Sequence, residues 1–144
     1  MKKNIMTLAL LTSVVCVNAQ KVTDADVPAA VKTEFKSLYA DVKEVKWEKE
    51  KSNYEANFSS GKTEMSVTIT ATGKLMETET SIDASALPKA ATDYLTKNLP
   101  GKKIKEASSI KDASGKITYE AEVDEVDYTF DDKGNFLKKE KDND

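Results

Sequence analysis

The sequence contains one pattern twice, and this repeat constrains the fold more than any other feature. Residues 87–91 (LPKAA) repeat residues 27–31 (VPAAV) at an offset of 60 positions. Residues 119–123 (YEAEV) repeat residues 54–58 (YEANF), and residues 133–136 (KGNF) repeat residues 72–75 (TGKL). The offset changes only between these segments, and insertions in a structural repeat collect in its loops. We therefore expect two copies of one small unit.

Each copy begins with a helical pattern and continues with a strand pattern. Apolar residues recur three and four positions apart over residues 27–42, and again over residues 87–99, as on one face of a helix. Pro28 and Pro88 stand where the first turn of a helix accepts proline. After each stripe, apolar and polar residues alternate between glycine-containing turns, which is typical of antiparallel strands with one buried face. Each copy is predicted to be a helix followed by four antiparallel strands.

The predicted fold class is α+β. Each copy is too small to bury its apolar face well alone, so the economical arrangement joins the strands of both copies in one sheet. The prediction is one continuous antiparallel sheet with both helices on one face. The predicted boundaries are a first repeat over 20–79, a linker over 80–86 and a second repeat over 87–140. A charged, frayed tail is expected over 141–144, and residues from 138 onward are also expected to fray.

Residues 1–19 are typical of a cleaved secretory signal peptide. Lys2 and Lys3 precede an uncharged apolar run over residues 5–17, and Ala19 ends a small-residue cleavage site. The run is too short for a membrane span, which needs about 20 apolar residues. Lipidation of Cys16 is an open alternative, although Val15 replaces the small residue usual before a lipidated cysteine. We expect a periplasmic or secreted product that does not insert into the membrane.

Missing residue types exclude several kinds of chemistry. The chain has no histidine and no arginine, and Cys16 is its only cysteine. Zinc, copper and haem sites therefore lose their usual ligands, and Ser-His-Asp or Cys-His catalysis is impossible. The net charge of −3 becomes more negative when Lys2 and Lys3 leave with the signal, which argues against nucleic acid as a partner. No cofactor and no enzymatic activity are predicted.

The repeated motifs resemble those of a known family. The second copy carries Leu87-Pro88, then Tyr119-Glu120-Ala121, then residues 130–136 (FDDKGNF). This order, found twice behind a signal peptide, resembles the PepSY-like family of exported bacterial proteins, which is related in fold to β-lactamase inhibitor proteins. The resemblance covers residues 26–140 and implies a tandem helix-plus-four-strand fold with a binding or inhibitory role. It supplies no catalytic residues. The first copy departs from the pattern at residues 70–73 (TATG), where the second copy is acidic.

The candidate site is an acidic strip on the face of the sheet opposite the core. Residues 117–131 contain six acidic residues and no lysine, and like charges on adjacent strands repel. Lysines on flanking strands, such as Lys103, Lys105 or Lys138, are one source of neutralisation. A basic partner and a hard cation such as calcium are the others. The predicted partner-binding residues are Glu120, Glu122, Asp127, Thr129 and Asp131.

Two functions follow from this strip. The first is an exported, inhibitor-like, non-enzymatic module that binds a basic envelope or extracellular protein or peptide through the open sheet face. The alternative is a periplasmic sensor or scavenger of a cation such as calcium, or of a small ligand, with Asp127, Asp131 and Asp132 as oxygen donors. Paired carboxylates such as Glu120 and Glu122 also serve glycoside hydrolases. A chain this short leaves little material for the deep cleft that such an enzyme needs.

Overall fold

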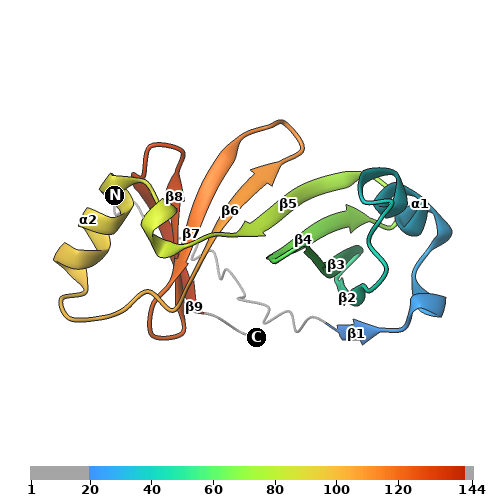
Figure 1. The fold of residues 1–144 in the computed structure, drawn as a ribbon, viewed down its shortest axis with the longest axis horizontal. Helices are drawn as coiled ribbons and strands as arrows, with labels where there is room; N and C mark the ends of the chain where they lie inside the picture. Colours follow the sequence, from blue (N-terminus) through green and yellow to red (C-terminus); the bar gives the residue numbers. More distant parts are fainter. Residues whose placement is uncertain (1–19, 142–144) are drawn as a thin grey trace, which may run out of the picture.

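The computed structural model describes residues 20–141. The described chain forms two α-helices, two short 3-10 turns and the strands of a single sheet (Figure 1). In chain order the elements are β1 (Gln20–Val22), α1 (Ala29–Leu38), β2 (Lys46–Glu50), β3 (Asn53–Ser60), β4 (Thr63–Thr70), β5 (Leu75–Ser81), α2 (Lys89–Asn98), β6 (Glu106–Asp112), β7 (Ile117–Glu122), β8 (Val126–Asp131) and β9 (Phe136–Lys141).

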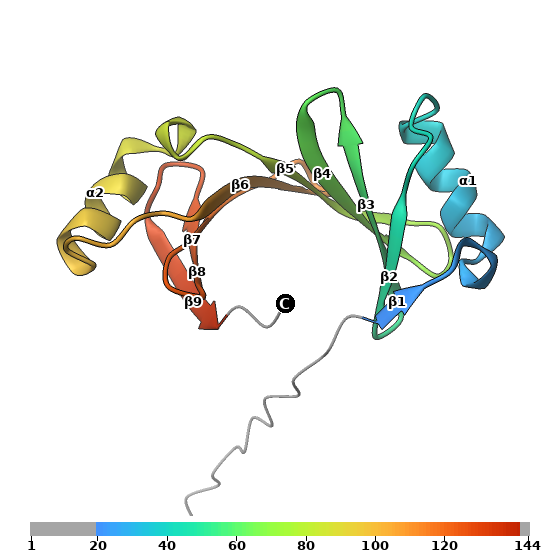
Figure 2. The same cartoon turned by 60° about the horizontal axis from the view of Figure 1, so that its bottom comes forward.

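The nine strands form one antiparallel sheet in the order of the chain, from β1 to β9. Every strand therefore pairs with its sequence neighbours, and β5 pairs with β6 where the first helix-and-strands segment meets the second. The sheet bends into an arch, with α1 and α2 outside its two ends (Figure 2). The predicted α+β class and continuous antiparallel sheet are confirmed.

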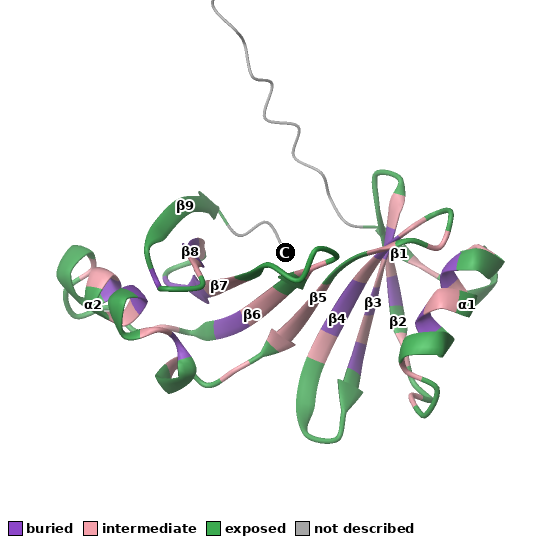
Figure 3. Ribbon diagram, turned by 90° about the horizontal axis from the view of Figure 1, so that it is seen from above, coloured by how far each residue is buried: buried purple, intermediate pink, exposed green. Residues whose placement is uncertain are grey.

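Each helix packs against its own buried cluster of strand residues (Figure 3). Under α1, the ring of Phe35 meets Trp47 and Phe58 edge-on, with centroids 5.5 and 5.1 Å apart. Under α2, Leu95 packs in a cluster with Phe130, which Tyr94 meets edge-on at 5.8 Å. Edge-to-face pairs of this kind stabilise a core beyond the area that they bury. The apolar stripes of the sequence therefore form two cores.

A glycine next to each helix start explains a repeated motif. Gly73 lies between β4 and β5 with φ of +84°, and Gly134 lies between β8 and β9 with φ of +86°. A Cβ on Gly73 would lie 2.8 Å from the carbonyl oxygen of Ala30, and one on Gly134 would lie 2.7 Å from the nitrogen of Ala91. Only glycine combines the left-handed backbone with such a close approach to the helix.

Several element boundaries differ from the sequence prediction. Helix α1 ends at Leu38, and Val42 packs against the core from the following loop. Strand β5 continues through residues 80 and 81, which were predicted to belong to the linker, because both residues pair with β6. Strand β9 runs to Lys141, so residues 138–141, which were expected to fray, pair with β8, while the rest of the predicted tail lies outside the described residues. Backbone pairing with β8 orders this strand, and its exposed lysines suit the edge of a sheet.

Candidate functional site

The strand register assigns each side chain to one of two faces, because directly paired residues point to the same side of a sheet. One cross-strand row, from Phe58 through Thr80 to Phe130, contains residues of both buried clusters. The opposite side is the hollow side of the arch, away from both helices (Figure 2), and we call it the concave face. Its central rows are Glu55, Thr68, Glu77, Asp112; Asn57, Ser66, Glu79, Ile110, Thr118, Asp131; Ser81, Ser108, Glu120, Thr129, Lys138; and Glu106, Glu122, Asp127, Glu140.

The five predicted partner-binding residues share the concave face of β7 and β8. Glu120 lies opposite Thr129, and Glu122 lies opposite Asp127. The Thr129 hydroxyl donates a hydrogen bond of 3.4 Å to Glu120. Asp131 lies further along β8, opposite a threonine of β7. The strip predicted from the sequence is therefore one surface, but its members sit in different environments.

Glu122 is already neutralised within the protein. Its side chain is only 8% exposed, and the Lys105 ammonium contacts its two carboxylate oxygens at 2.9 and 3.2 Å. The lysine side chain itself stays 63% exposed. Burial of a carboxylate requires such a partner, since an unpaired buried charge is strongly destabilising. Lysine neutralisation, one of the readings left open by the sequence, applies at this position.

Asp131 is a turn residue. One of its carboxylate oxygens accepts hydrogen bonds from the backbone N–H groups of Lys133 and Asn135, at 2.9 and 2.8 Å. A hydrogen bond from the Asn135 side-chain amide, together with these backbone bonds, lowers the pKa of the Asp131 carboxyl. At the equivalent turn of the first half, the hydroxyl of Thr70 accepts the matching bond from the N–H of Lys74. The acidic motif of residues 130–136 thus closes a hairpin, a task that threonine performs in the first half.

Glu120 lies at the centre of the concave face in an unfavourable electrostatic environment. Burial, followed by the charges of Asp127 and Glu79, raises the pKa of Glu120 to about 7. The hydrogen bond from Thr129 and the charge of Lys138 act in the opposite direction and are weaker. Like charges and desolvation both favour the protonated carboxyl. Near neutral pH, a negative charge on Glu120 is therefore unfavourable in the free protein.

Strand β5 contributes acids that the sequence analysis did not include in the site. Glu79 lies between Ser66 of β4 and Ile110 of β6, and Glu77 lies one row away. Desolvation in the hollow of the arch, together with the charges of Glu79 and Glu50, raises the pKa of Glu77. The pairing of β5 with β6 brings these side chains toward Glu120. The alternation of glutamate with threonine over residues 77–80 could have indicated a strand with these acids on one face. Which residues of β6 lie opposite them depends on the strand register, which the alternation does not give.

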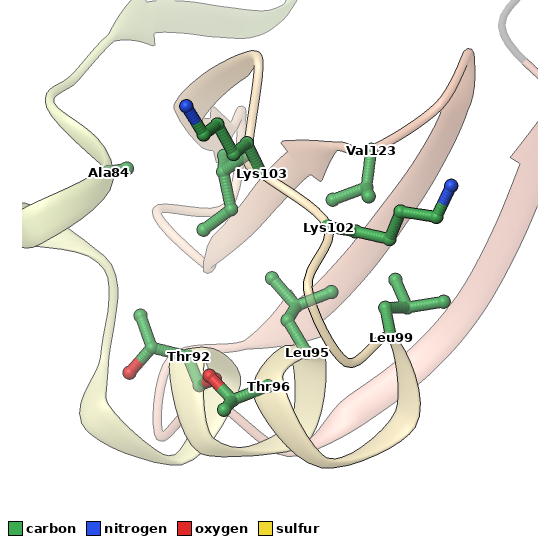
Figure 4. Close-up of a pocket in the computed structure, with 9 residues that line it drawn as sticks. Ala84, Thr92, Leu95, Thr96, Leu99, Lys102, Lys103 and Val123 are labelled. Carbon is green, nitrogen blue, oxygen red and sulfur yellow. The ribbon is translucent and has the colours of Figure 1, made fainter.

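Two hollows lie beside the helices, at equivalent places in the two halves of the chain. A pocket of about 360 Å³ lies between α2 and the loop to β6, where Leu95, Leu99 and Val123 converge and the ammonium groups of Lys102 and Lys103 point outward (Figure 4). A groove of about 1250 Å³ lies beside α1. Phe35 and Lys43 line that groove, and Leu95 and Lys103 follow them by 60 positions in the pocket. These hollows repeat with the fold.

The alternative cation ligands are not gathered into a metal site. Within residues 20–141, no group of three or more His, Cys, Asp or Glu side chains is arranged to hold a metal ion. Of the three candidates Asp127, Asp131 and Asp132, Asp131 already uses its carboxylate in the turn. The same part of the chain contains no helix that is long and apolar enough to cross a membrane. The predicted signal peptide, with Cys16 and Ala19, lies outside the described residues.

Comparison with known proteins places the chain in a family. The model of the family described as "Putative beta-lactamase-inhibitor-like, PepSY-like" matches twice, over residues 14–77 and 67–138. The chain belongs to this PepSY-like family, and the resemblance seen in the sequence motifs is confirmed. None of the curated proteins compared with the chain matches it.

Solved structures share the fold at low sequence identity. A BLIP-like protein of Bacteroides fragilis is 20% identical with a TM-score of 0.63, over 79% of this chain and 86% of its own. A DUF2874 family protein of Bacteroides uniformis is 16% identical with a TM-score of 0.71, over 79% and 88%. A Bacteroides eggerthii structure described as "putative periplasmic proteins" is 16% identical with a TM-score of 0.71, and the match covers 80% of this chain and 88% of its own. These similarities show the fold.

Proposed function

We propose that this protein is an exported, non-enzymatic, inhibitor-like module that binds a protein or peptide through its concave face. The observation that carries the proposal is the helix-free hollow side of a continuous nine-stranded sheet, with an acidic centre at Glu120. Charge that is destabilising in the free protein is favourable once a complementary charge covers it. The inhibitor-like family description supports a binding role.

The binding surface belongs to a duplicated unit with both helices on the convex side. Register irregularities between Thr68 and Ile69 and between Thr129 and Phe130 fall at equivalent positions, 61 residues apart. The two glycines against the helix starts and the two matches of the family model support the same duplication. In such an arrangement, the two units form the two sides of one arch, and the pairing of β5 with β6 joins them.

Export and lack of catalysis complete the proposal. The signal-like residues 1–19 and the description of a structural neighbour as periplasmic support a location outside the cytoplasm. The absence of histidine and arginine from the chain, and of cysteine beyond Cys16, supports a non-catalytic role. The module is expected to act by occupying a surface of its partner.

Site-specific photocrosslinking in the native envelope tests this proposal. A benzophenone amino acid replaces Thr68 or Thr118 on the concave face, or Lys111 on the opposite face as the matched control. All three positions lie in central strands, so the variants differ mainly in the face that they probe. The expected result is a discrete protein adduct from Thr68 and Thr118 and none from Lys111. Adducts from Lys111 alone would contradict the concave face as the binding surface.

A further inference from the structure

Two serines flank β5 on the concave face, Ser66 on β4 and Ser108 on β6, and no hydrogen bond within the described chain involves either hydroxyl. Ser66 and Ser108 are 9% and 8% exposed, and neither hydroxyl has a hydrogen-bond partner in the described chain. Ser66 lies opposite Glu79, and Ser108 lies opposite Glu120. No fully buried side-chain oxygen within residues 20–141 is left unsatisfied, so both hydroxyls still reach the surface of the concave face. A hydroxyl at the surface of this face is hydrated in the free protein, and it can exchange that water for a hydrogen bond with a ligand.

The carboxylates beside these serines are poorly compensated. No ion pair or hydrogen bond of the described chain involves the carboxylate of Glu79, and Glu120 accepts only the long 3.4 Å bond from Thr129. Lys138, the lysine that acts on Glu120, is engaged with Glu140 at 2.6 Å. Two carboxylates and two hydroxyls thus face the same hollow with spare capacity to accept hydrogen bonds.

Building on the function proposed above, we propose that the partner places a lysine or arginine side chain between Glu79 and Glu120, with the hydroxyl of Ser108 completing its coordination. An ammonium group has three donors and a guanidinium group has five, so either satisfies both carboxylates and a hydroxyl together. Ile110, half-buried on the same face and paired with Glu79, offers an apolar surface for the methylene stem of the incoming side chain.

This geometry locates recognition at the junction of the two halves rather than on β7 and β8 alone. Glu79 comes from β5 and Glu120 from β7, with Ser108 of β6 between them. A cation seated there holds the charged form of Glu120, and near neutral pH its entry therefore releases a proton from the carboxyl. Proton release distinguishes this site from a diffuse attraction between opposite net charges.

Calorimetry with a defined probe tests the proposal. The probe is an acetylated and amidated tetra-lysine peptide, and its Nε-acetylated form is the uncharged control. Titration at pH 7 in two buffers of different ionisation enthalpy measures the protons released. The wild-type protein should release about half a proton per peptide, because the pKa of Glu120 lies close to the pH of the titration. E120Q should abolish this release.

Matched variants separate the site from net charge. E79Q/E120Q should weaken tetra-lysine binding about tenfold or more, whereas E125Q/D132N, with the same charge change at exposed turn positions, should weaken it about twofold or less. S108A, which keeps every charge, should also weaken binding. Equal weakening in the two double variants, or unchanged proton release in E120Q, would overturn the proposal. The crosslinking result stands independently, since adducts from Thr68 and Thr118 require no cationic contact at Glu120.

Discussion

The raised pKa of Glu120 predicts that the protein loses stability as the pH rises through neutrality. The folded state holds a proton on Glu120 up to about pH 7, whereas the unfolded chain loses it near 4.5. Between these values the folded state binds more protons, so the free energy of unfolding falls with increasing pH. The full shift corresponds to about 3 kcal/mol at 1.36 kcal/mol per pKa unit, and solvent screening reduces it to about 1–3 kcal/mol.

The substitution E120Q removes the contribution of Glu120 to this pH dependence while keeping the shape of the side chain, whereas Glu77, whose pKa burial also raises, still contributes in the same direction. The variant should be about 1–3 kcal/mol more stable than the wild type at pH 8 and nearly equal to it at pH 5. Urea unfolding at pH 5, 6, 7 and 8 measures the difference, with E125Q at an exposed turn as the charge-matched control. Asp112 and Asp131 have lowered pKa values, so they titrate below this window. A wild-type protein that E120Q does not stabilise at pH 8 would refute the electrostatic reasoning.

Three further predictions concern the scaffold. G134A should destabilise the fold by about 2–4 kcal/mol in thermal unfolding, because the added Cβ meets the start of α2. The control G115A, at a similar φ but in open space, should destabilise it by only about 1–2 kcal/mol. Equal losses in the two variants would show that the contact with α2 does not matter. D131A should lower the melting temperature more than D131T, since Thr70 fills the same turn role in the first half. K105M should destabilise the protein by about 2–4 kcal/mol in urea unfolding, because it leaves the buried carboxylate of Glu122 without its ion-pair partner. The double variant K105M/E122Q should recover most of this loss.

The repeat and its periodicity predicted the architecture well, because they reflect local geometry. Apolar positions such as Val31 and Phe35 recur at helical spacing, and both are buried under α1 as that pattern requires. The alternation around Trp47 likewise identified a strand with one buried face. The stripe overran the helix, however, since Val42 reaches the same core from a loop. Apolar spacing reports what is buried, and it does not distinguish the last turn of a helix from the loop after it.

The centre of the site was not predictable from local pattern. Which residues of β5 oppose β6 depends on the pairing of two strands that are separated in the chain by α2. That pairing places Glu79 near Glu120, across a boundary that the sequence suggested was a linker. The raised pKa of Glu120 further depends on its burial and on the charges of Asp127 and Glu79, which only the assembled sheet brings near it. Composition located the acids, and long-range pairing selected those that matter.

Carboxylate footprinting of the protein, alone and with the partner that photocrosslinking identifies, is the most direct test of binding through the concave face. Carbodiimide coupling of glycine ethyl ester, read by mass spectrometry, reports the accessibility of each acid with and without the partner. Binding should protect Glu77 and Glu79 of β5 and Glu120 of β7, and leave Asp93 on the exposed side of α2 unchanged. Protection of Asp93 with unchanged labelling of Glu79 and Glu120 would contradict the account.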